Sequence, residues 1–204
     1  GVAERIKFDV FTGITRILFL AGVESEIKRK YFVQRRQLNL HIEQARKHSK
    51  RDDHLNGVAL LDSLKNDPAY KIVPWYEIMV LNEPIHWDDA LLRTVIGLAR
   101  SAQGAVISPI TYLRSLEPIA EENDEIKKER RWQSSQFIQA LVMHELGHVF
   151  GLFSEANNKN PTDRELKEAH CPNICAMYWL TRINIRNPFC PSCLEKLKQF
   201  FIEP

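Results

Sequence analysis

The chain has 204 residues, which is about one ordinary domain and long enough to bury a real core. Hydrophobic residues make up 44% and charged residues 26%, values typical of a soluble globular protein. Lys and Arg number 28 against 26 Asp and Glu, and this small excess gives no basis for a nucleic-acid or membrane-surface partner.

No apolar run approaches the length of a transmembrane helix, and the N-terminus lacks the basic start and compact apolar stretch of a secretory leader. The four cysteines all lie between Cys171 and Cys193 as two close pairs, unlike a disulfide framework. This placement favours metal binding in a reducing compartment. We therefore expect a cytoplasmic protein, and we expect it to be a monomer.

The first 56 residues predict two strands separated by a helix. Residues 5–11 alternate in polarity and predict a strand, and residues 32–40 predict a second one. Residues 13–32 have helical spacing between them. The side chains expected to face inward from this helix are Ile14, Ile17, Leu18 and Ala21. The polar segment 41–56 is expected to be exposed, and so are the histidines outside the candidate site, which are His41, His48, His54 and His86.

The middle of the chain predicts a short helix followed by strands. Residues 57–67 predict the helix. The apolar content of residues 70–85 is typical of strands, and residues 91–100 and 104–113 predict further strands or strand–helix pieces.

From Asn123 the chain is highly charged and then runs into a long helix that is apolar on two sides. One side holds Ile138, Val142, Leu146 and Val149, and roughly the opposite side holds Phe137, Leu141, His144 and His148. A helix that is apolar on two sides is buried on two sides. Strands, then a buried helix, then a cysteine-rich tail predict an α/β (α+β) fold.

The stretch H-E-x-x-H at 144–148 carries the first chemical signal. His144 and His148 are four residues apart, so a helix directs both rings to one metal ion. Glu145 lies beside that metal without being the obvious ligand, where its carboxylate can act as general base for a metal-activated water. Gly151 then allows a sharp left-handed turn out of the helix. The alternative is a chance occurrence of the pattern.

The tail "HCPNICAMYW" and "FCPSC" carries the second signal. Its pairs C-x3-C and C-x2-C are separated by 14 residues (176–189) and can close a tetrahedral four-cysteine zinc site. The ligands would be Cys171, Cys175, Cys190 and Cys193. The alternative is four buried free thiols.

Together these residues resemble the archaemetzincin family of zinc peptidases in the metzincin clan. The matching positions are His144, Glu145, His148, Gly151, His170, Cys171, Cys175, Met177, Cys190 and Cys193. The family pattern is H-E-x-x-H-x-x-G-x-x-H-C-x4-C-x-M followed by C-x-x-C. Looser matches upstream are "HLNGVALLDSL", "VIGLA" and "GAVIS". The specific match covers about a third of the chain, residues 144–204.

The resemblance implies a zinc metallopeptidase with a metzincin-like zincin fold: a twisted mixed sheet, a long active-site helix and a small C-terminal subdomain stapled by zinc. Two zinc ions are implied, a catalytic one on His144, His148 and His170 and a structural one on the four cysteines. The substrate would be a peptide or protein. Met177 would form the methionine turn beneath the histidines, or simply pack in the core.

The chain departs from the family pattern between the helix and His170. Residues 153–169 stand where the family has a single residue, and the first cysteine pair is spaced x3 rather than x4. Ser154, at the regular third-ligand position, is a poor zinc ligand, so His170 is aligned with that role. The predicted organisation is one domain, with an upper subdomain (residues 1–152), an inserted loop (residues 153–169) and a C-terminal subdomain (residues 170–204).

Two alternatives remain open at the site. A carboxylate such as Glu165 or Glu168 could replace His170 as third ligand, or the insertion could leave a non-catalytic zinc-binding module. By resemblance, "GAVIS" (104–108) is an edge strand that pairs with extended peptides, or else an ordinary strand. Tyr178 could stabilise an oxyanion or serve only in packing.

Overall fold

The computed structural model describes residues 2–23, 35–66, 76–87, 94–116, 122–153, 162–178 and 188–202. The helices in these ranges are α1 (Val2–Leu20), α2 (Arg35–Lys47), α3 (Gly57–Lys65), α5 (Ile110–Ser115), α6 (Asp124–Val149), α7 (Asp163–Glu168) and α8 (Pro191–Ile202). The strands are β1 (Leu55–Asn56), β2 (Glu77–Val80), β3 (Ile85–His86), β4 (Thr94–Val95), β5 (Gly97–Arg100) and β6 (Gly104–Ile107).

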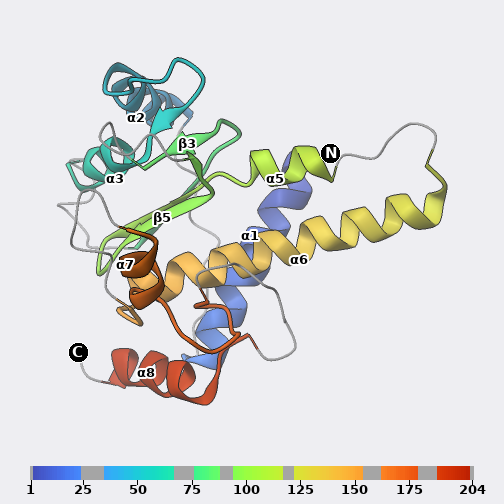
Figure 1. Cartoon of the computed structure of the whole chain (residues 1–204), viewed down its shortest axis with the longest axis vertical. Coiled ribbons are helices and arrows are strands. Elements are labelled where there is room, and N and C mark those ends of the chain that lie inside the picture. Colours follow the sequence, from blue (N-terminus) through green and yellow to red (C-terminus); the bar gives the residue numbers. More distant parts are fainter. Residues whose placement is uncertain are drawn as a thin grey trace.

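The strands form two small mixed sheets. One has the order β2-β6-β5, with β2 parallel and β5 antiparallel to β6. The other has the order β1-β3-β4, with β1 parallel and β4 antiparallel to β3. Helix α3 packs on β5 and β6, α6 also packs on both strands, and α1 packs against α6 (Figure 1). The predicted α/β class, with a mixed sheet and a long histidine-bearing helix, is confirmed.

Of the two interpretations of "GAVIS", the ordinary strand is correct and the edge strand is wrong. Its residues form β6, which is hydrogen-bonded on both sides, to β2 and to β5. All four β6 residues are buried, as expected of a central strand that is covered on both faces. Within the described residues, the antiparallel strand at the edge of this sheet is β5.

The predicted strand at 5–11 is also wrong, because these residues belong to α1. The apparent alternation fails at Phe8, which is 67% exposed, whereas Ile6 and Val10 pack against the core four residues apart. Asp9 is buried and accepts a hydrogen bond from Ser135 Oγ on α6 at 2.5 Å. The four side chains predicted to face inward from the helix at 13–32 do so: Ile14, Ile17, Leu18 and Ala21.

The predicted second strand likewise corresponds to a helix. Residues 35–40 begin α2, and Leu38, Ile42 and Ala45 share its inner face at helical spacing. Residues 24–34 of the two predicted elements lie outside the described residues. The segment 41–56 was expected to be exposed, but Ala45 of α2 and both residues of β1, Leu55 and Asn56, are buried.

Three of the four histidines expected at the surface are buried instead: His41, His54 and His86. Each has a hydroxyl partner that satisfies a ring nitrogen: Ser63 Oγ at 2.5 Å, Thr94 Oγ1 at 2.9 Å and Ser49 Oγ at 2.8 Å, respectively. Hydrogen bonding of this kind offsets the cost of burying an imidazole.

The predicted helix at 57–67 is confirmed as α3. The Asn56 side chain caps it by accepting from Ala59 N at 2.9 Å, and it ends at Lys65. The β2-β6-β5 sheet has the longer strands and is called the larger sheet below. The main core lies between this sheet, α6, α1 and the C-terminal segments. A second hydrophobic cluster lies between the same sheet, α2 and α3. Among the described helices, none has the length and apolar character that crossing a bilayer requires.

Candidate metal centres

Helix α6 carries the first centre and is well defined at both ends. The Asn123 side chain caps its start by accepting from Ile126 N at 2.9 Å. At its end Gly151 has a φ of 72°, and its N–H donates to His148 O while Leu152 N–H donates to Gly147 O. This Schellman arrangement needs the left-handed conformation that glycine adopts without strain. From Phe137 onward every α6 residue is buried.

Three histidines converge at the C-terminal half of α6. His148 Nε2 lies 3.3 Å from His144 Nε2 and also 3.3 Å from His170 Nε2. Two Zn–N bonds of about 2.0–2.1 Å at a tetrahedral angle span about 3.3–3.4 Å between the nitrogens. Both separations match the spacing required by one zinc ion, and the three histidines form a group that could hold a metal.

The other ring nitrogens of the α6 histidines are held by backbone carbonyls. His144 Nδ1 lies 2.6 Å from Ala176 O, and His148 Nδ1 lies 3.1 Å from Phe153 O. Because a carbonyl only accepts, each Nδ1 carries the proton and each Nε2 presents its lone pair to the shared point. These two contacts orient both rings for metal binding.

Burial keeps these rings neutral. It lowers the pKa of His144 well below the ordinary value, and the neighbouring His148 and His170 lower it further. Burial also lowers the pKa of His148, to about 4, with His170 again contributing. A neutral imidazole at neutral pH is the form that binds a metal.

The two carboxylates considered as third ligands are engaged elsewhere. Glu165 forms a capping box at the start of α7, where its Oε2 accepts from Thr162 N at 2.6 Å. Glu168 Oε1 accepts from Arg164 Nε at 2.8 Å. The segment expected to be an inserted loop thus contains a capped helix, α7, directly before His170. Ser154 lies outside the described residues.

Glu145 is buried beside the histidines, with 5% of its surface exposed. Its side chain lies against Gly97 at the start of β5, so that a methyl group added at Gly97 would be 2.5 Å from the Glu145 Cδ. The carboxylate therefore points from α6 to the edge strand of the larger sheet. Sequence reasoning missed Gly97; the available signal was a glycine inside the apolar strand segment "VIGLA".

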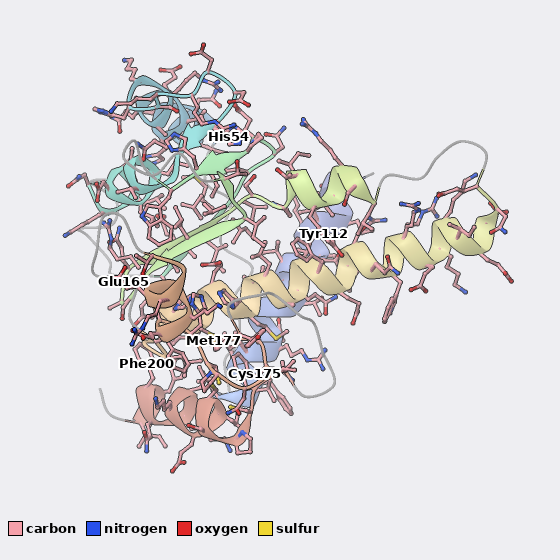
Figure 2. The ribbon with its side chains drawn as sticks, viewed as in Figure 1. His54, Tyr112, Glu165, Cys175, Met177 and Phe200 are labelled. Atoms are coloured by element: carbon pink, nitrogen blue, oxygen red, sulfur yellow. The ribbon has the colours of Figure 1, made fainter. Side chains whose placement is uncertain are left out.

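Met177 is fully buried and packs against Gly147, which lies between His144 and His148 in α6. Its thioether contacts the Cα of Gly147, where a side chain would overlap the Met177 sulfur. A tight turn holds it, because Tyr178 N–H donates to Cys175 O at 2.9 Å. Cys171 N–H also donates to Met177 O at 2.8 Å. Figure 2 shows Cys175 and Met177 on the same side of α6.

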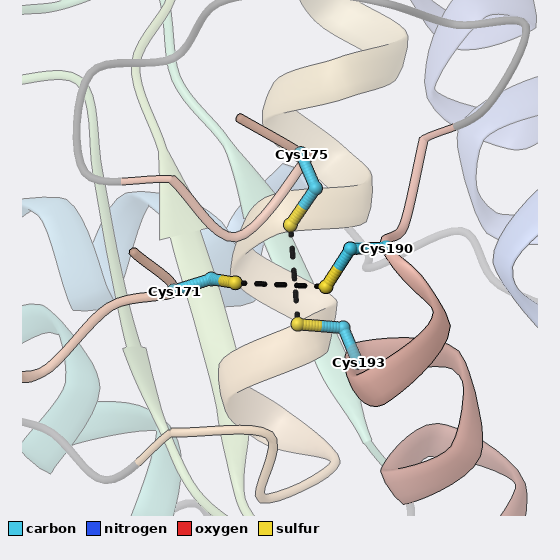
Figure 3. Close-up of side chains that lie close together, drawn as sticks. All are labelled: Cys171, Cys175, Cys190 and Cys193. Carbon is cyan, nitrogen blue, oxygen red and sulfur yellow. Dashed lines mark hydrogen bonds between the residues drawn. The ribbon is translucent and has the colours of Figure 1, made fainter. Parts of the chain in front are cut away.

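The four cysteines form the second centre. All are free thiols, and Figure 3 shows their sulfurs pointing toward one another. The Cys171 and Cys190 sulfurs are 3.7 Å apart, and those of Cys175 and Cys193 are 3.9 Å apart. A disulfide would require about 2.05 Å, whereas two Zn–S bonds of about 2.3 Å at a tetrahedral angle span about 3.8 Å. The arrangement fits zinc.

The thiols cannot all ionise together without a cation. The Cys193 thiol can donate to a Cys175 thiolate, which lowers the pKa of Cys175 to about 5, and the same hydrogen bond raises the pKa of Cys193. Burial raises the pKa of Cys171 to about 11. A divalent cation removes this conflict, because it stabilises all four thiolates at once.

Comparison with known proteins gives one curated relative and one solved structure. No protein-family model matches the chain. An archaemetzincin from Thermococcus kodakarensis is 32% identical over 111 residues, 52% of this chain and 47% of the relative. The chain thus spans about half the length of the curated relative that it matches. The crystal structure of an archaemetzincin from Methanopyrus kandleri aligns with a TM-score of 0.48 and 19% identity, over 88% of this chain and 92% of that one.

Proposed function

Since this chain is archaemetzincin-like, we propose that it is a zinc-dependent metallopeptidase that hydrolyses peptide bonds in a peptide or protein substrate. The observation that carries the proposal is the cluster of three histidines, in which His148 Nε2 lies at zinc-ligand spacing from the other two Nε2 atoms, with a buried carboxylate beside them. His144, His148 and His170 are the ligands that would hold the catalytic zinc.

Zinc bound there would supply a Lewis acid that polarises the substrate carbonyl and acidifies a water. Glu145 is the general base: its carboxylate accepts a proton from the attacking water. The same carboxylate then returns a proton to the leaving amine, so that water is consumed and one acid and one amine are formed. Burial excludes competing bulk water from the carboxylate.

The four cysteines are proposed to hold a second, structural zinc, giving two zinc ions per chain. Cys171 follows His170 directly, and Cys175 precedes Ala176, whose carbonyl accepts from His144. A metal at the cysteines would therefore fix both the third histidine and the carbonyl that orients the first. Met177, between these elements, supports the histidine pair from below.

The proposed substrate-binding strand is β5, in place of β6. β5 lies at the edge of its sheet among the described residues, and it begins beside Glu145. An extended peptide can add to such an edge through backbone hydrogen bonds. Tyr178 stays a candidate for oxyanion stabilisation; its backbone closes the methionine turn.

We further propose one catalytic domain, with an upper subdomain (residues 1–152) and a C-terminal subdomain (residues 170–204), in a monomeric cytoplasmic protein. Four free thiols gathered in one cluster support a reducing location. The segment 153–169, with helix α7, connects the two subdomains.

The test is zinc content and peptide hydrolysis of the wild type beside Glu145→Ala. Because a general base contributes about 10²–10⁴-fold, we expect the variant to lose at least 10²-fold in kcat while it retains two zinc ions. Glu129→Ala, on the exposed N-terminal half of the same helix, is the control and should keep full activity.

A second variant, His170→Ala, tests the ligand set. It should retain only the cysteine-bound zinc, so that zinc per chain falls from two to one. Retention of both ions would refute the assignment of His170. A wild type that binds one zinc through cysteine and hydrolyses no peptide would instead identify a non-catalytic zinc-binding module.

A further inference from the structure

Gly97 occupies the position where β5 comes closest to the side chain of Glu145. A methyl group placed there would lie 2.9 Å from Glu145 Cγ, 2.5 Å from Cδ and closer still to Oε1. Real side-chain contacts do not reach such separations. Any side chain at position 97 therefore competes with the Glu145 carboxylate for the same space.

Backbone conformation does not explain this glycine. The described glycines with positive φ are Gly22 and Gly151, so the backbone of Gly97 is one that other residues adopt without strain. Nor is glycine favoured in a strand, where it weakens the element. What glycine provides at this position is the absence of a side chain.

We propose that Gly97 is a positioning residue: by lacking a side chain it lets Glu145 lie against β5 in the place where it acts as general base. The proposal rests on the proposed metallopeptidase function, and it extends the site from α6 to the edge strand. Gly97 acts through Glu145 and touches no reacting atom.

The surrounding contacts decide which group moves when position 97 gains a methyl group. Strand β5 is fixed by its antiparallel pairing, in which Gly97 is opposite Ile107. The preceding Ile96 O accepts from Ser108 N at 2.8 Å. Helix α6 is packed against α1 and against β5 and β6. The Glu145 carboxylate, at the end of three rotatable bonds, is the group that yields.

Gly97→Ala is therefore expected to spare the fold and impair the reaction. Displacing a catalytic group by about 1 Å costs roughly 10²-fold, so kcat should fall by about that factor. KM should stay within about threefold, and two zinc ions should remain bound. A variant with unchanged kcat would overturn the proposal.

Gly57→Ala is the matched control. A methyl group there would overlap the Leu98 Cδ1 on the neighbouring position of β5, and would lie 3.0 Å from His86 O. It disturbs packing next to the same strand without reaching Glu145. Its kcat should be retained; an equal loss of kcat in both variants would mean that damage to packing, not the position of Glu145, explains the effect.

A double variant isolates the route of action. In a Glu145→Ala background, Gly97→Ala should change the residual rate by less than about twofold, because a positioning residue has no effect once its target is gone. A further loss of tenfold or more would show that Gly97 acts independently of Glu145, contrary to the proposal.

A crystal structure of zinc-loaded Gly97→Ala provides a readout that needs no substrate. We expect the Glu145 carboxylate to be displaced by about 1 Å or more while the three histidine rings stay in place. A carboxylate left in its original position would overturn the proposal. If the wild type binds zinc but hydrolyses nothing, the proposed function fails, and this structure still decides the role of Gly97.

Discussion

The histidine and cysteine centres are neighbours in the chain but are built in different ways. Two of the three histidines project from one long helix, α6, whose C-terminal half is buried throughout. The cysteines come from turns around 171–176 and from the start of α8. The histidine centre thus rests on a packed core, while the cysteine centre joins the turns at 171–176 to the start of α8.

This difference indicates what each metal does for the fold. Burial lowers the pKa of His144 and His148, and backbone carbonyls orient both rings, so these two ligands are held by the protein itself. The thiols do not ionise together, because the hydrogen bond that lowers the pKa of Cys175 raises that of Cys193, and burial raises the pKa of Cys171. Under the proposed two-zinc assignment, packing orients the histidines before zinc binds, whereas zinc binding would order the cysteine-bearing segments.

The largest expected effect is the loss of the cysteine-bound zinc. Structural zinc sites contribute about 10–16 kcal/mol of apparent folding energy in small peptides, so Cys193→Ala should unfold much of residues 171–202. Zinc per chain should fall, and limited proteolysis should cut selectively in this region. Ser192→Ala, an exposed neighbour on the same helix, is the control. If Cys193→Ala resisted proteolysis as well as the wild type does, the cysteine centre would not depend on metal for its structure, and the proposed difference between the two centres would be contradicted.

The next effect is at the histidine centre. His148→Ala should bind one zinc instead of two, yet keep the described fold. At free zinc about 1,000 times Kd, the wild type gains about 4 kcal/mol from one site, and the variant should lack this gain. Thermal unfolding with zinc and with chelator measures it. Proteolysis of α6 in the variant would mean that this centre also depends on metal for its structure.

The smallest effect is a pH dependence of the zinc-free protein. The pKa of His148 is about 4 in the fold against an ordinary 6.5. Above pH 6.5 the ring is neutral in both states and stability is complete; as pH falls toward 4 only the unfolded state gains the proton, so the free energy of unfolding decreases. The shift corresponds to roughly 3 kcal/mol.

Denaturant unfolding of the chelated protein between pH 7 and pH 4 measures this dependence. In His148→Leu the decrease should be smaller, because one of the buried imidazoles that resists protonation is gone. Identical slopes for the wild type and the variant would contradict the description of this ring as neutral and buried.

Sequence reasoning succeeded where chemistry depends on short spacing. The i, i+4 pair His144 and His148 and the two cysteine pairs are local patterns. The structure places the histidine pair with His170 in one group of possible metal ligands, and the four cysteines in a second group. Sequence reasoning failed where partners are distant. Asp9 is buried and accepts a hydrogen bond from Ser135 of α6, whereas Phe8 of α1 is exposed. The alternating pattern in residues 5–11 does not reveal these positions.

Strand order was equally hidden. Whether β6 is central or at the edge depends on its pairing with both β2 and β5, and nothing within "GAVIS" records those neighbours. Gly97 was overlooked for the same reason, since its significance comes from a carboxylate on another element. The capping box of α7, by contrast, was readable from Thr162 and Glu165 but was obscured by the polar composition of the insertion.

The most direct test of two separate zinc centres is an anomalous diffraction map of the zinc-loaded protein at the zinc absorption edge. We expect two peaks. One should lie about 2.0–2.1 Å from the Nε2 atoms of His144, His148 and His170, and the other about 2.3 Å from the four cysteine sulfurs. A single peak at the cysteines, or a peak at the α6 histidines without His170, would contradict this arrangement.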